Sequence, residues 1–453
     1  MNINKYIFRG YDIRGVYPKD INGEVANIIG KSFGTYVKRL GKKICIVGRD
    51  NRYSSNELSK ALIDGILSTG INVIDLGLVT TPMYYYACIL KKIPTGIMVT
   101  ASHNPKDDNG FKFAFDERGN ARGEMIEEFR NFTLKGDFDV GKGVLSNYDI
   151  RDEYIKLMTS SIKLGKRPLK IVIDLGNGTT TCIAKDIYYR FPIDIETLYG
   201  ENDSNFPNHH PDPSLEENLE VLKRKVVELK ADVGIAFDGD GDRIGIVDEK
   251  GNYISTDKYM IIIARDIIDK LQNKKILYDV KCTKALEDEI IHLGAEPVCY
   301  RIGNSYVKAK INEDNIPFGG EMSGHVYFKD RWPGFDSGLY AGLRLIEILS
   351  KTDKPLSMLL DGINYYESTP EIKFSSSDEI KFSVIDKIKD YCVDKDYEIL
   401  TIDGVRVTFN DGWALVRCSN TGPAITARFE ATTKERLEKI KNEFVNLINE
   451  YNK

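Results

Sequence analysis

Four short clusters of polar residues and glycines in this 453-residue chain have the composition of a reactive site. The first, residues 100–105 (T-A-S-H-N-P), has the small residues and proline of a turn that presents the Ser102 hydroxyl to solvent. His103 is a candidate base, although adjacency in sequence does not by itself give the geometry of a catalytic pair. An ordinary turn with a capping serine fits these residues equally well.

The second cluster, residues 238–243 (D-G-D-G-D-R), concentrates negative charge. Asp238, Asp240 and Asp242 repel one another, and the glycines between them let the backbone fold so that all three converge. A hard divalent cation such as Mg²⁺ would offset this repulsion. A solvated acidic turn is the alternative, but the apolar segments on both sides favour a loop held at a sheet end. The calcium EF-hand pattern does not fit, because its later Glu and flanking helices are missing.

The third cluster, residues 319–325 (G-G-E-M-S-G-H), places Glu321, Ser323 and His325 on a glycine-flexible loop. A carboxylate that accepts two O–H donors suits vicinal sugar hydroxyls. A hairpin turn with incidental polar residues fits as well.

The fourth cluster, residues 417–423 (R-C-S-N-T-G-P), offers a guanidinium, hydroxyls and an amide, which suit a phosphate. A loop whose Ser and Thr bond their own backbone fits as well.

The elements before these clusters show how they are positioned. Short apolar strands, such as residues 96–99 and 233–237, alternate with helices, such as residues 181–190 and 215–229, in three successive rounds. This alternation predicts mainly parallel sheets with chemistry beyond the carboxyl ends of the strands. From about residue 366 the pattern changes, and N-D-G between two apolar runs predicts a hairpin. The fold class is therefore α/β: three similar α/β domains with mixed, mainly parallel sheets, then an α+β domain with an antiparallel sheet. We expect domains at residues 1–147, 148–252, 253–366 and 367–453.

Composition excludes several classes of protein. The formal net charge of -5 gives no basic excess for coating nucleic acid. No apolar run reaches the roughly 18 residues of a membrane span. The seven cysteines are scattered without a C-x-x-C pair, which argues against a disulfide framework and favours a reducing, cytoplasmic location.

In this order, the four clusters resemble those of the α-D-phosphohexomutase family and are most similar to its phosphomannomutase/phosphoglucomutase members. Residues 8–15 (F-R-G-Y-D-I-R-G), 107–112 (D-D-N-G-F-K) and 279–283 (D-V-K-C-T) also fit. The resemblance covers nearly the whole chain and implies four domains around a central cleft. It also implies interconversion of hexose 1-phosphate and hexose 6-phosphate (mannose, glucose or both) through a phosphoserine enzyme and a hexose 1,6-bisphosphate.

The resemblance implies roles position by position. Ser102 carries the phosphoryl group, Arg243 positions it, and a phosphate oxygen on Ser102 completes an Mg²⁺ site with Asp238, Asp240 and Asp242.

The sugar is implied to bind Glu321 and Ser323. The implied distal phosphate cradle is Arg417, Ser419, Asn420 and Thr421. The other residues implied to line the cleft are Tyr11, Arg14, His103, Lys112, Lys281 and His325. Of these, Lys112 and His325 are the better candidates for proton transfer.

Two departures from the family pattern stand out, and the first of them leaves the sugar open. Gly303-Asn304 stands where the mannose/glucose branch usually has Gly-His, and it is more similar to the pattern of phosphoglucosamine mutases. Met322, in contrast, favours the mannose/glucose branch. Gly422 stands where many members have Glu or Thr. A phosphoglucosamine mutase is therefore the first alternative. A non-catalytic sugar-phosphate binding protein and a metal-dependent phosphatase are the others. The expected partners are small sugar phosphates, and a monomer and a dimer are both compatible with the sequence.

Overall fold

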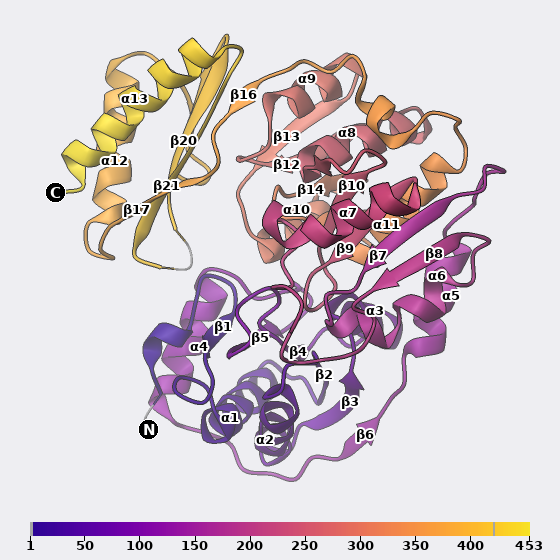
Figure 1. Ribbon diagram of the computed structural model, residues 1–453. Helices are drawn as coiled ribbons and strands as arrows, with labels where there is room; N and C mark the ends of the chain where they lie inside the picture. Colours follow the sequence, from indigo (N-terminus) through magenta and orange to yellow (C-terminus); the bar gives the residue numbers. More distant parts are fainter. Residues whose placement is uncertain (1–2, 420–421) are drawn as a thin grey trace.

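The computed structural model describes residues 3–419 and 422–453, which form four sheets in chain order (Figure 1). The first sheet has the strand order β1-β5-β4-β2-β3-β6. Its strands are β1 (Ile13–Val16), β2 (Ile44–Arg49), β3 (Asn72–Leu78), β4 (Gly96–Val99), β5 (Asp108–Ala114) and β6 (Leu145–Asn147). Three neighbouring pairs are parallel, and β5 runs antiparallel to both β1 and β4. Its helices are α1 (Gly23–Arg39), α2 (Ser55–Leu67), α3 (Thr81–Lys91) and α4 (Glu124–Lys135).

The second and third sheets are also mixed. The second has the order β11-β10-β9-β7-β8 and the third β13-β12-β14-β15. The second comprises β7 (Lys170–Asp174), β8 (Asp194–Leu198), β9 (Val233–Phe237), β10 (Ile244–Asp248) and β11 (Tyr253–Ile254), with α5 (Arg151–Ser160), α6 (Ala184–Tyr188) and α7 (Glu220–Leu229). The third comprises β12 (Lys275–Asp279), β13 (Glu296–Tyr300), β14 (Phe318–Gly320) and β15 (Val326–Phe328), with α8 (Thr256–Ile267), α9 (Lys284–His292), α10 (Asn304–Glu313) and α11 (Gly338–Leu349).

The fourth sheet is antiparallel throughout its described pairs. Its strands and helices are β16 (Glu367–Ser368), β17 (Ile372–Ser375), β18 (Glu398–Leu400), β19 (Val405–Phe409), β20 (Gly412–Cys418), β21 (Ala424–Ala431), α12 (Lys381–Asp394) and α13 (Lys434–Tyr451). The predicted hairpin is confirmed, because Phe409 pairs with Gly412 across the turn between β19 and β20. The predicted α/β fold with an α+β end is thus confirmed.

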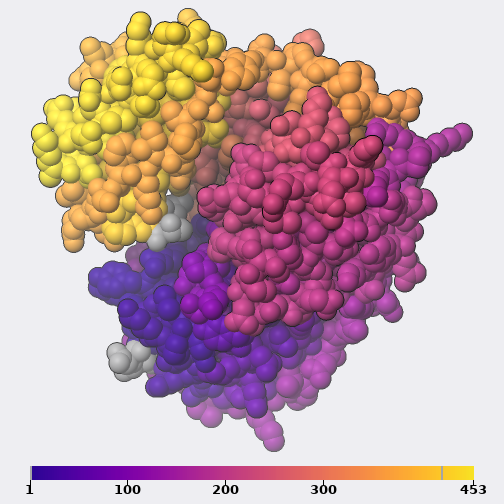
Figure 2. Space-filling view, in the orientation of Figure 1, coloured from indigo at the N-terminus to yellow at the C-terminus, as the bar shows by residue number. Residues whose placement is uncertain are grey.

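The apolar cores show which parts pack as units. One continuous core joins the second and third sheets and extends to α3 and one face of the first sheet, and α11 contributes the buried Leu339, Tyr340 and Leu343 to it. The fourth sheet has a separate core under α12 and α13. Figure 2 shows the consequence: the yellow C-terminal part stands apart, and the visible face is hollowed between it and the rest. None of the described helices is long and apolar enough to cross a bilayer.

Two predicted helices are shorter than expected. The helix predicted at residues 181–190 is a 3-10 turn (Thr179–Cys182) followed by α6, and that predicted at 215–229 becomes α-helical only at Glu220. Hydrophobic spacing alone does not distinguish a 3-10 turn from the first turn of an α-helix.

Candidate active site

All four clusters lie in hairpin connections between antiparallel strands. Residues 100–107 connect β4 to β5, 238–243 connect β9 to β10, 321–325 connect β14 to β15, and the fourth cluster lies between β20 and β21. The clusters therefore do follow buried strands, as predicted. However, each of the first three clusters belongs to an antiparallel pair inside a mixed sheet, which the strand–helix alternation did not predict.

Ser102 is buried, which corrects the prediction of a solvent-exposed serine. Only 1 % of the residue is accessible, and its φ of 53° lies in the left-handed region that non-glycine residues rarely adopt. Its Oγ donates to Asp238 Oδ2 at 2.9 Å and lies 3.1 Å from His103 Nδ1. The acidic loop of the second sheet thus closes over the serine, and a strained conformation of this kind is typical of functional loops.

Arg52, in the loop after β2, holds the serine loop, and sequence reasoning missed it. Its guanidinium donates to the backbone carbonyls of Ser102 (2.7 Å), Asn104 (2.6 Å), Pro105 (2.6 Å) and Asp108 (2.9 Å). The Arg52 side chain is 1 % exposed. One signal was available: Arg52 follows a parallel strand whose carboxyl end meets the same sheet edge as the serine loop.

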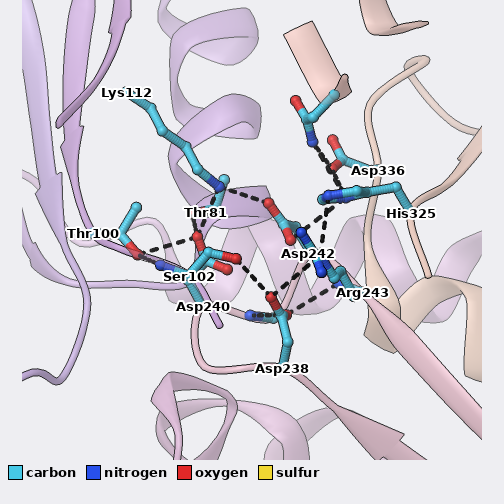
Figure 3. A network of polar contacts seen from close by, with 12 residues as sticks. Thr81, Thr100, Ser102, Lys112, Asp238, Asp240, Asp242, Arg243, His325 and Asp336 are labelled. Carbon is cyan, nitrogen blue, oxygen red and sulfur yellow. Dashed lines mark hydrogen bonds and ion pairs between the residues drawn. The ribbon is translucent and has the colours of Figure 1, made fainter. Parts of the chain in front are cut away.

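The acidic loop brings its three carboxylates together, as predicted (Figure 3). One oxygen from each of Asp238, Asp240 and Asp242 lies within 4.8 Å of the others, and all three residues are fully buried. Gly241, with a φ of 80°, makes the tight turn between them. The Lys112 ammonium, from β5, contacts Asp240 Oδ2 at 2.8 Å and Asp242 Oδ2 at 2.7 Å.

The charges in this cluster shift one another's protonation. Burial, reinforced by Asp242 and Asp240, raises the pKa of Asp238 well above its usual range. Burial also raises the pKa of Asp240, but the Lys112 ammonium outweighs it, so the pKa lies below its usual range. The pKa of Lys112 is raised well above its usual value, because Asp240 and Asp242 overcome the effect of burial.

Two further side chains, Thr81 and Thr100, donate to Asp240 Oδ2 at 2.6 and 3.2 Å, and neither was predicted. On the other side of these carboxylates, Asp240 Oδ1 and Asp242 Oδ1 are buried without a hydrogen-bond partner in the described chain. Unpartnered, all-oxygen donors are what a hard divalent cation needs, so these residues fit a magnesium ion.

A second network begins at the end of the acidic loop. Arg243 Nε donates to His325 Nε2 at 3.1 Å, so the other ring nitrogen, Nδ1, carries a hydrogen and donates to Asp336 Oδ2 at 2.8 Å. Burial lowers the pKa of His325, but Asp242 and Asp336 reverse this, and the net shift is upward. Asn304 also donates to Asp336. No sequence motif pointed to Asp336, which lies on the connection before α11.

His103 is in the opposite electrostatic environment. Burial and the nearby Arg243 and Arg14 guanidinium groups lower the pKa of His103 well below its usual value. The ring is therefore neutral at physiological pH beside the Ser102 hydroxyl.

The predicted sugar loop faces the same space. Glu321 is buried, its Oε1 accepts the Gly303 N–H at 2.7 Å and its Oε2 accepts the Tyr327 hydroxyl at 3.2 Å. Burial raises the pKa of Glu321. A cavity of about 90 Å³ lies between this loop and the serine loop. The predicted site residues in its walls are Tyr11, Arg14, Ser102, Lys112, Arg243, Glu321, Ser323 and His325.

Three of the predicted binding residues, Arg417, Ser419 and Lys281, do not line this cavity. Arg417 pairs through Nε with Asp403 Oδ1 at 3.2 Å, while its Nη2 is buried without a hydrogen-bond partner among residues 3–419 and 422–453. Ser419 lies at the start of the β20–β21 connection, and Asn420 and Thr421 fall outside the described residues. Lys281 pairs with Glu371 at 3.6 Å and is not in the cavity wall.

Arg14 ties the N-terminal segment to the serine loop. Its Nε donates to Asp12 at 2.7 Å, and its Nη1 donates to the Asn104 side chain. Burial disfavours the charge, but Asp12 overcomes this and raises the pKa of Arg14. The site therefore keeps a permanent cation beside the serine loop, together with Arg243.

Four models of one protein family match successive parts of the chain. They describe phosphoglucomutase/phosphomannomutase alpha/beta/alpha domain I (residues 5–139), domain II (152–251), domain III (255–366) and the C-terminal domain (371–447).

Individual proteins are similar along the whole length. The chain is 42 % identical over 442 residues to a phosphomannomutase/phosphoglucomutase of Pseudomonas aeruginosa, covering 98 % of this chain and 95 % of that protein. It is 39 % identical over 451 residues to a phosphoglucomutase of Neisseria gonorrhoeae, covering 99 % of this chain and 97 % of that protein. A crystal structure of a phosphoglucomutase/phosphomannomutase family protein from Burkholderia thailandensis superposes with a TM-score of 0.92 at 40 % identity, covering 99 % and 98 %.

Proposed function

The chain belongs to the phosphoglucomutase/phosphomannomutase family, and we propose that it interconverts hexose 1-phosphates and hexose 6-phosphates through a phosphoryl group carried on Ser102. One observation supports the proposal most strongly. The Ser102 hydroxyl contacts the acidic loop at 2.9 Å and lies in the wall of a cavity that Glu321 and Arg243 share. A nucleophile, a cation site and a sugar-binding carboxylate therefore meet at one point.

The reaction consists of two reciprocal transfers. In the first, the bond between Ser102 Oγ and phosphorus breaks as the free hydroxyl of the hexose monophosphate bonds to phosphorus. A base takes the proton of that hydroxyl, and the departing Ser102 Oγ takes up a proton and becomes a hydroxyl. The hexose 1,6-bisphosphate then presents its other phosphate, and Ser102 Oγ takes it back. Transfers of this kind depend on positioning and charge stabilisation. Arg243 supplies fixed positive charge, and Lys112 and His325 are the candidates for moving the proton.

Asp238, Asp240 and Asp242 would hold Mg²⁺ together with an oxygen of phosphorylated Ser102. The ion, when bound, neutralises negative charge on the transferring phosphoryl group. Removing it with a chelator should stop turnover, and added Mg²⁺ should restore it.

The sugar and the distal phosphate are held by other domains. Glu321 would accept hydrogen bonds from hydroxyls O3 and O4, which lie nearly alike in the two bound orientations. Arg417 Nη2, which has no hydrogen-bond partner within the described part of the chain, would donate to the phosphate that is not reacting. Because glucose and mannose differ only at C2, a loop that binds O3 and O4 accepts both.

A phosphoglucosamine mutase remains the second candidate, on one observation. Asn304 lines the cavity, and its Oδ1 is buried without a hydrogen-bond partner in the described chain. A free acceptor there suits the amino group of glucosamine. Turnover of glucose, mannose and glucosamine 6-phosphates at equal concentration separates the two, because a phosphoglucosamine mutase uses the last far faster.

The test of the proposed activity is a coupled assay on these sugar phosphates, with and without a catalytic amount of hexose 1,6-bisphosphate. We expect turnover that the bisphosphate stimulates and that Ser102→Ala abolishes. Full activity in that variant, or activity unchanged by excess chelator, would contradict the proposal. Release of inorganic phosphate at the rate of turnover would indicate a phosphatase. A cytoplasmic location, in keeping with seven free cysteines, belongs to the same proposal.

A further inference from the structure

A second pocket, of about 540 Å³, opens behind the candidate active site. It lies between α3 and the 114–120 segment on one side and α10 and the 333–335 segment on the other. Tyr84, Tyr85, Ile89, Ile93 and Phe335 give it largely apolar walls. Pockets of this size, with apolar walls and few polar groups, are typical of sites for small organic ligands.

Lys308, on α10, is the cation of this pocket. The residue is 9 % exposed, and its ammonium group lies 3.2 Å from the centre of the Tyr85 ring and donates to Asn120 Oδ1 at 2.7 Å. Asn120 in turn donates to the Tyr85 hydroxyl at 2.8 Å. Within residues 3–419 and 422–453, Lys308 forms no ion pair with a carboxylate. A buried cation without a counter-charge is costly, so a ligand anion would be favoured there.

The surroundings of Lys308 show the same lack of a counter-charge. Burial lowers the pKa of Lys308 to about 7. The more distant Asp336 and Asp242 oppose this shift, and Lys112 adds to it. The thiol of Cys88 in the pocket wall has its pKa raised to about 12 by burial and stays neutral.

The other charged groups of this wall lie at its rim. Asp116 is paired with Arg118, and Glu117 with Lys42, while Lys92 adds a further cation. The two carboxylates are thus already neutralised by partners outside the pocket.

The pocket shares both of its helices with the catalytic centre. Tyr85 lies one helical turn after Thr81, whose hydroxyl donates to Asp240 at 2.6 Å. Lys308 lies one turn after Asn304, which donates to Asp336 and contacts His325 Nδ1 at 3.3 Å. Residues four apart lie on the same face of a helix, so a ligand that moves Tyr85 or Lys308 also moves these contacts.

We propose that this pocket is a regulatory site for a small planar aromatic carboxylate, whose ring packs on the Tyr85 side and whose anion pairs with Lys308. Occupancy spreads α3 from α10 and so disturbs the Thr81–Asp240 and Asn304–Asp336 contacts. The proposal concerns control of the activity proposed above, but its binding part does not depend on that activity.

Calorimetric titration of the full chain with 2-naphthoate, compared with the neutral 2-naphthamide, tests the binding. We expect saturable binding of the carboxylate, weakened about tenfold or more by Lys308→Met, which removes one charge-assisted hydrogen bond. Because the ammonium form binds the anion, affinity should fall as pH rises from 6 to 9 in the wild type and stay level in the variant. Ile89→Trp, at a half-exposed pocket position, should block binding without removing the charge.

The regulatory part is tested by kinetics at saturating 2-naphthoate. We expect kcat to fall about threefold or more, within the usual range of coupling between sites, with KM nearly unchanged. Equal binding to wild type and Lys308→Met, or no binding at millimolar 2-naphthoate, would overturn the site. Binding without any change in kcat would overturn its regulatory role. An inactive enzyme that still binds 2-naphthoate through Lys308 would contradict only the proposed function.

Discussion

Arg52 shows how one buried side chain fixes a reactive loop. Its guanidinium bonds four backbone carbonyls between Ser102 and Asp108 and pairs with Asp50 at 3.3 Å. Lysine keeps the charge but lacks the planar fork of donors. We therefore expect Arg52→Lys to lower kcat by roughly 10- to 100-fold, as misplaced reacting groups do, with little change in KM.

Steady-state kinetics of Arg52→Lys beside Arg49→Lys provide the comparison. Arg49 is the last residue of β2, three residues before Arg52. Within the described chain its side chain makes one hydrogen bond, to the Asp50 carbonyl at 3.4 Å, so its variant should keep kcat. Equal kcat values in the two variants would show that Arg52 does not position the serine loop.

Glu321 makes a prediction about pH. Its pKa is raised by burial, so the ionised form that accepts sugar hydroxyls is lost as pH falls through that raised value. Glu321→Gln keeps the shape and loses a charged hydrogen bond, which should lower kcat/KM about 10- to 100-fold at pH 8. The ratio of wild-type to variant kcat/KM should shrink as pH falls. A ratio that does not change with pH would contradict the assignment of Glu321 as the ionised acceptor of sugar hydroxyls.

The same shift fixes the sign of a stability effect. The pKa of Glu321 is higher in the folded protein than in the unfolded chain, so protonation of Glu321 stabilises the fold at pH values below its unfolded-state pKa. This contribution to the free energy of unfolding is lost as pH rises through the folded-state pKa. Glu321→Gln should therefore unfold at higher denaturant concentration than the wild type at pH 8. Glu347 is a control of opposite sign: despite burial, hydrogen bonds from Arg331 and Lys351 lower its pKa, so Glu347→Gln should destabilise at pH 8.

At the level of the elements, strand β5 supplies the acidic loop with a cation. Lys112 contacts both Asp240 and Asp242, and removing one partner of a buried ion pair costs about 3–5 kcal/mol. Without Mg²⁺, Lys112→Met should therefore have a lower melting temperature than the wild type. Added Mg²⁺ should raise the melting temperature of the variant by more than it raises that of the wild type. Lys106→Met, at an exposed position of the same hairpin loop, is the control. The same Mg²⁺ response in both variants would mean that no cation binds this loop.

The elements also show where sequence reasoning stopped. Strand boundaries followed from apolar runs such as residues 96–99 and 233–237, because these strands are buried on both faces. The antiparallel β5 and β10 were not predicted as partners of the clusters, because periodicity defines strands but not their pairing. The burial of Ser102 was missed for a related reason: the acidic loop that covers it lies more than a hundred residues further along the chain.

Across the assembled protein, the fourth sheet is expected to hold the phosphate that does not react. Arg417→Ala should lower kcat/KM by about one to two orders of magnitude, the loss of one charged hydrogen bond or more. The factor should be similar for glucose 1-phosphate and mannose 1-phosphate, because the contact reaches phosphate and not C2. Arg436→Ala, on α13 of the same domain and paired with Asp411, should leave both values unchanged. A loss confined to one sugar would show that Arg417 contacts the ring.

The α/β fold class could be predicted, and so could the grouping of Ser102, the acidic loop and the Glu321 loop, because their motifs are local in sequence. The sequence did not predict the contacts of Arg52, Asp336 and Asn304, because the residues that they contact are brought near only by the fold. The role of Lys281 stays a prediction: its motif match implies a place in the cleft, and in this structure its ammonium pairs with Glu371 at 3.6 Å.

Phosphopeptide mapping of the protein after incubation with hexose 1,6-bisphosphate tests the phosphoserine directly. We predict one phosphoryl group, on the peptide that contains Ser102, and its loss to sugar when excess glucose 1-phosphate is added in a single turnover. In Ser102→Ala, this peptide should carry no phosphoryl group. A phosphoryl group on another residue, or a phosphorylated Ser102 that hexose monophosphate cannot discharge, would contradict the account.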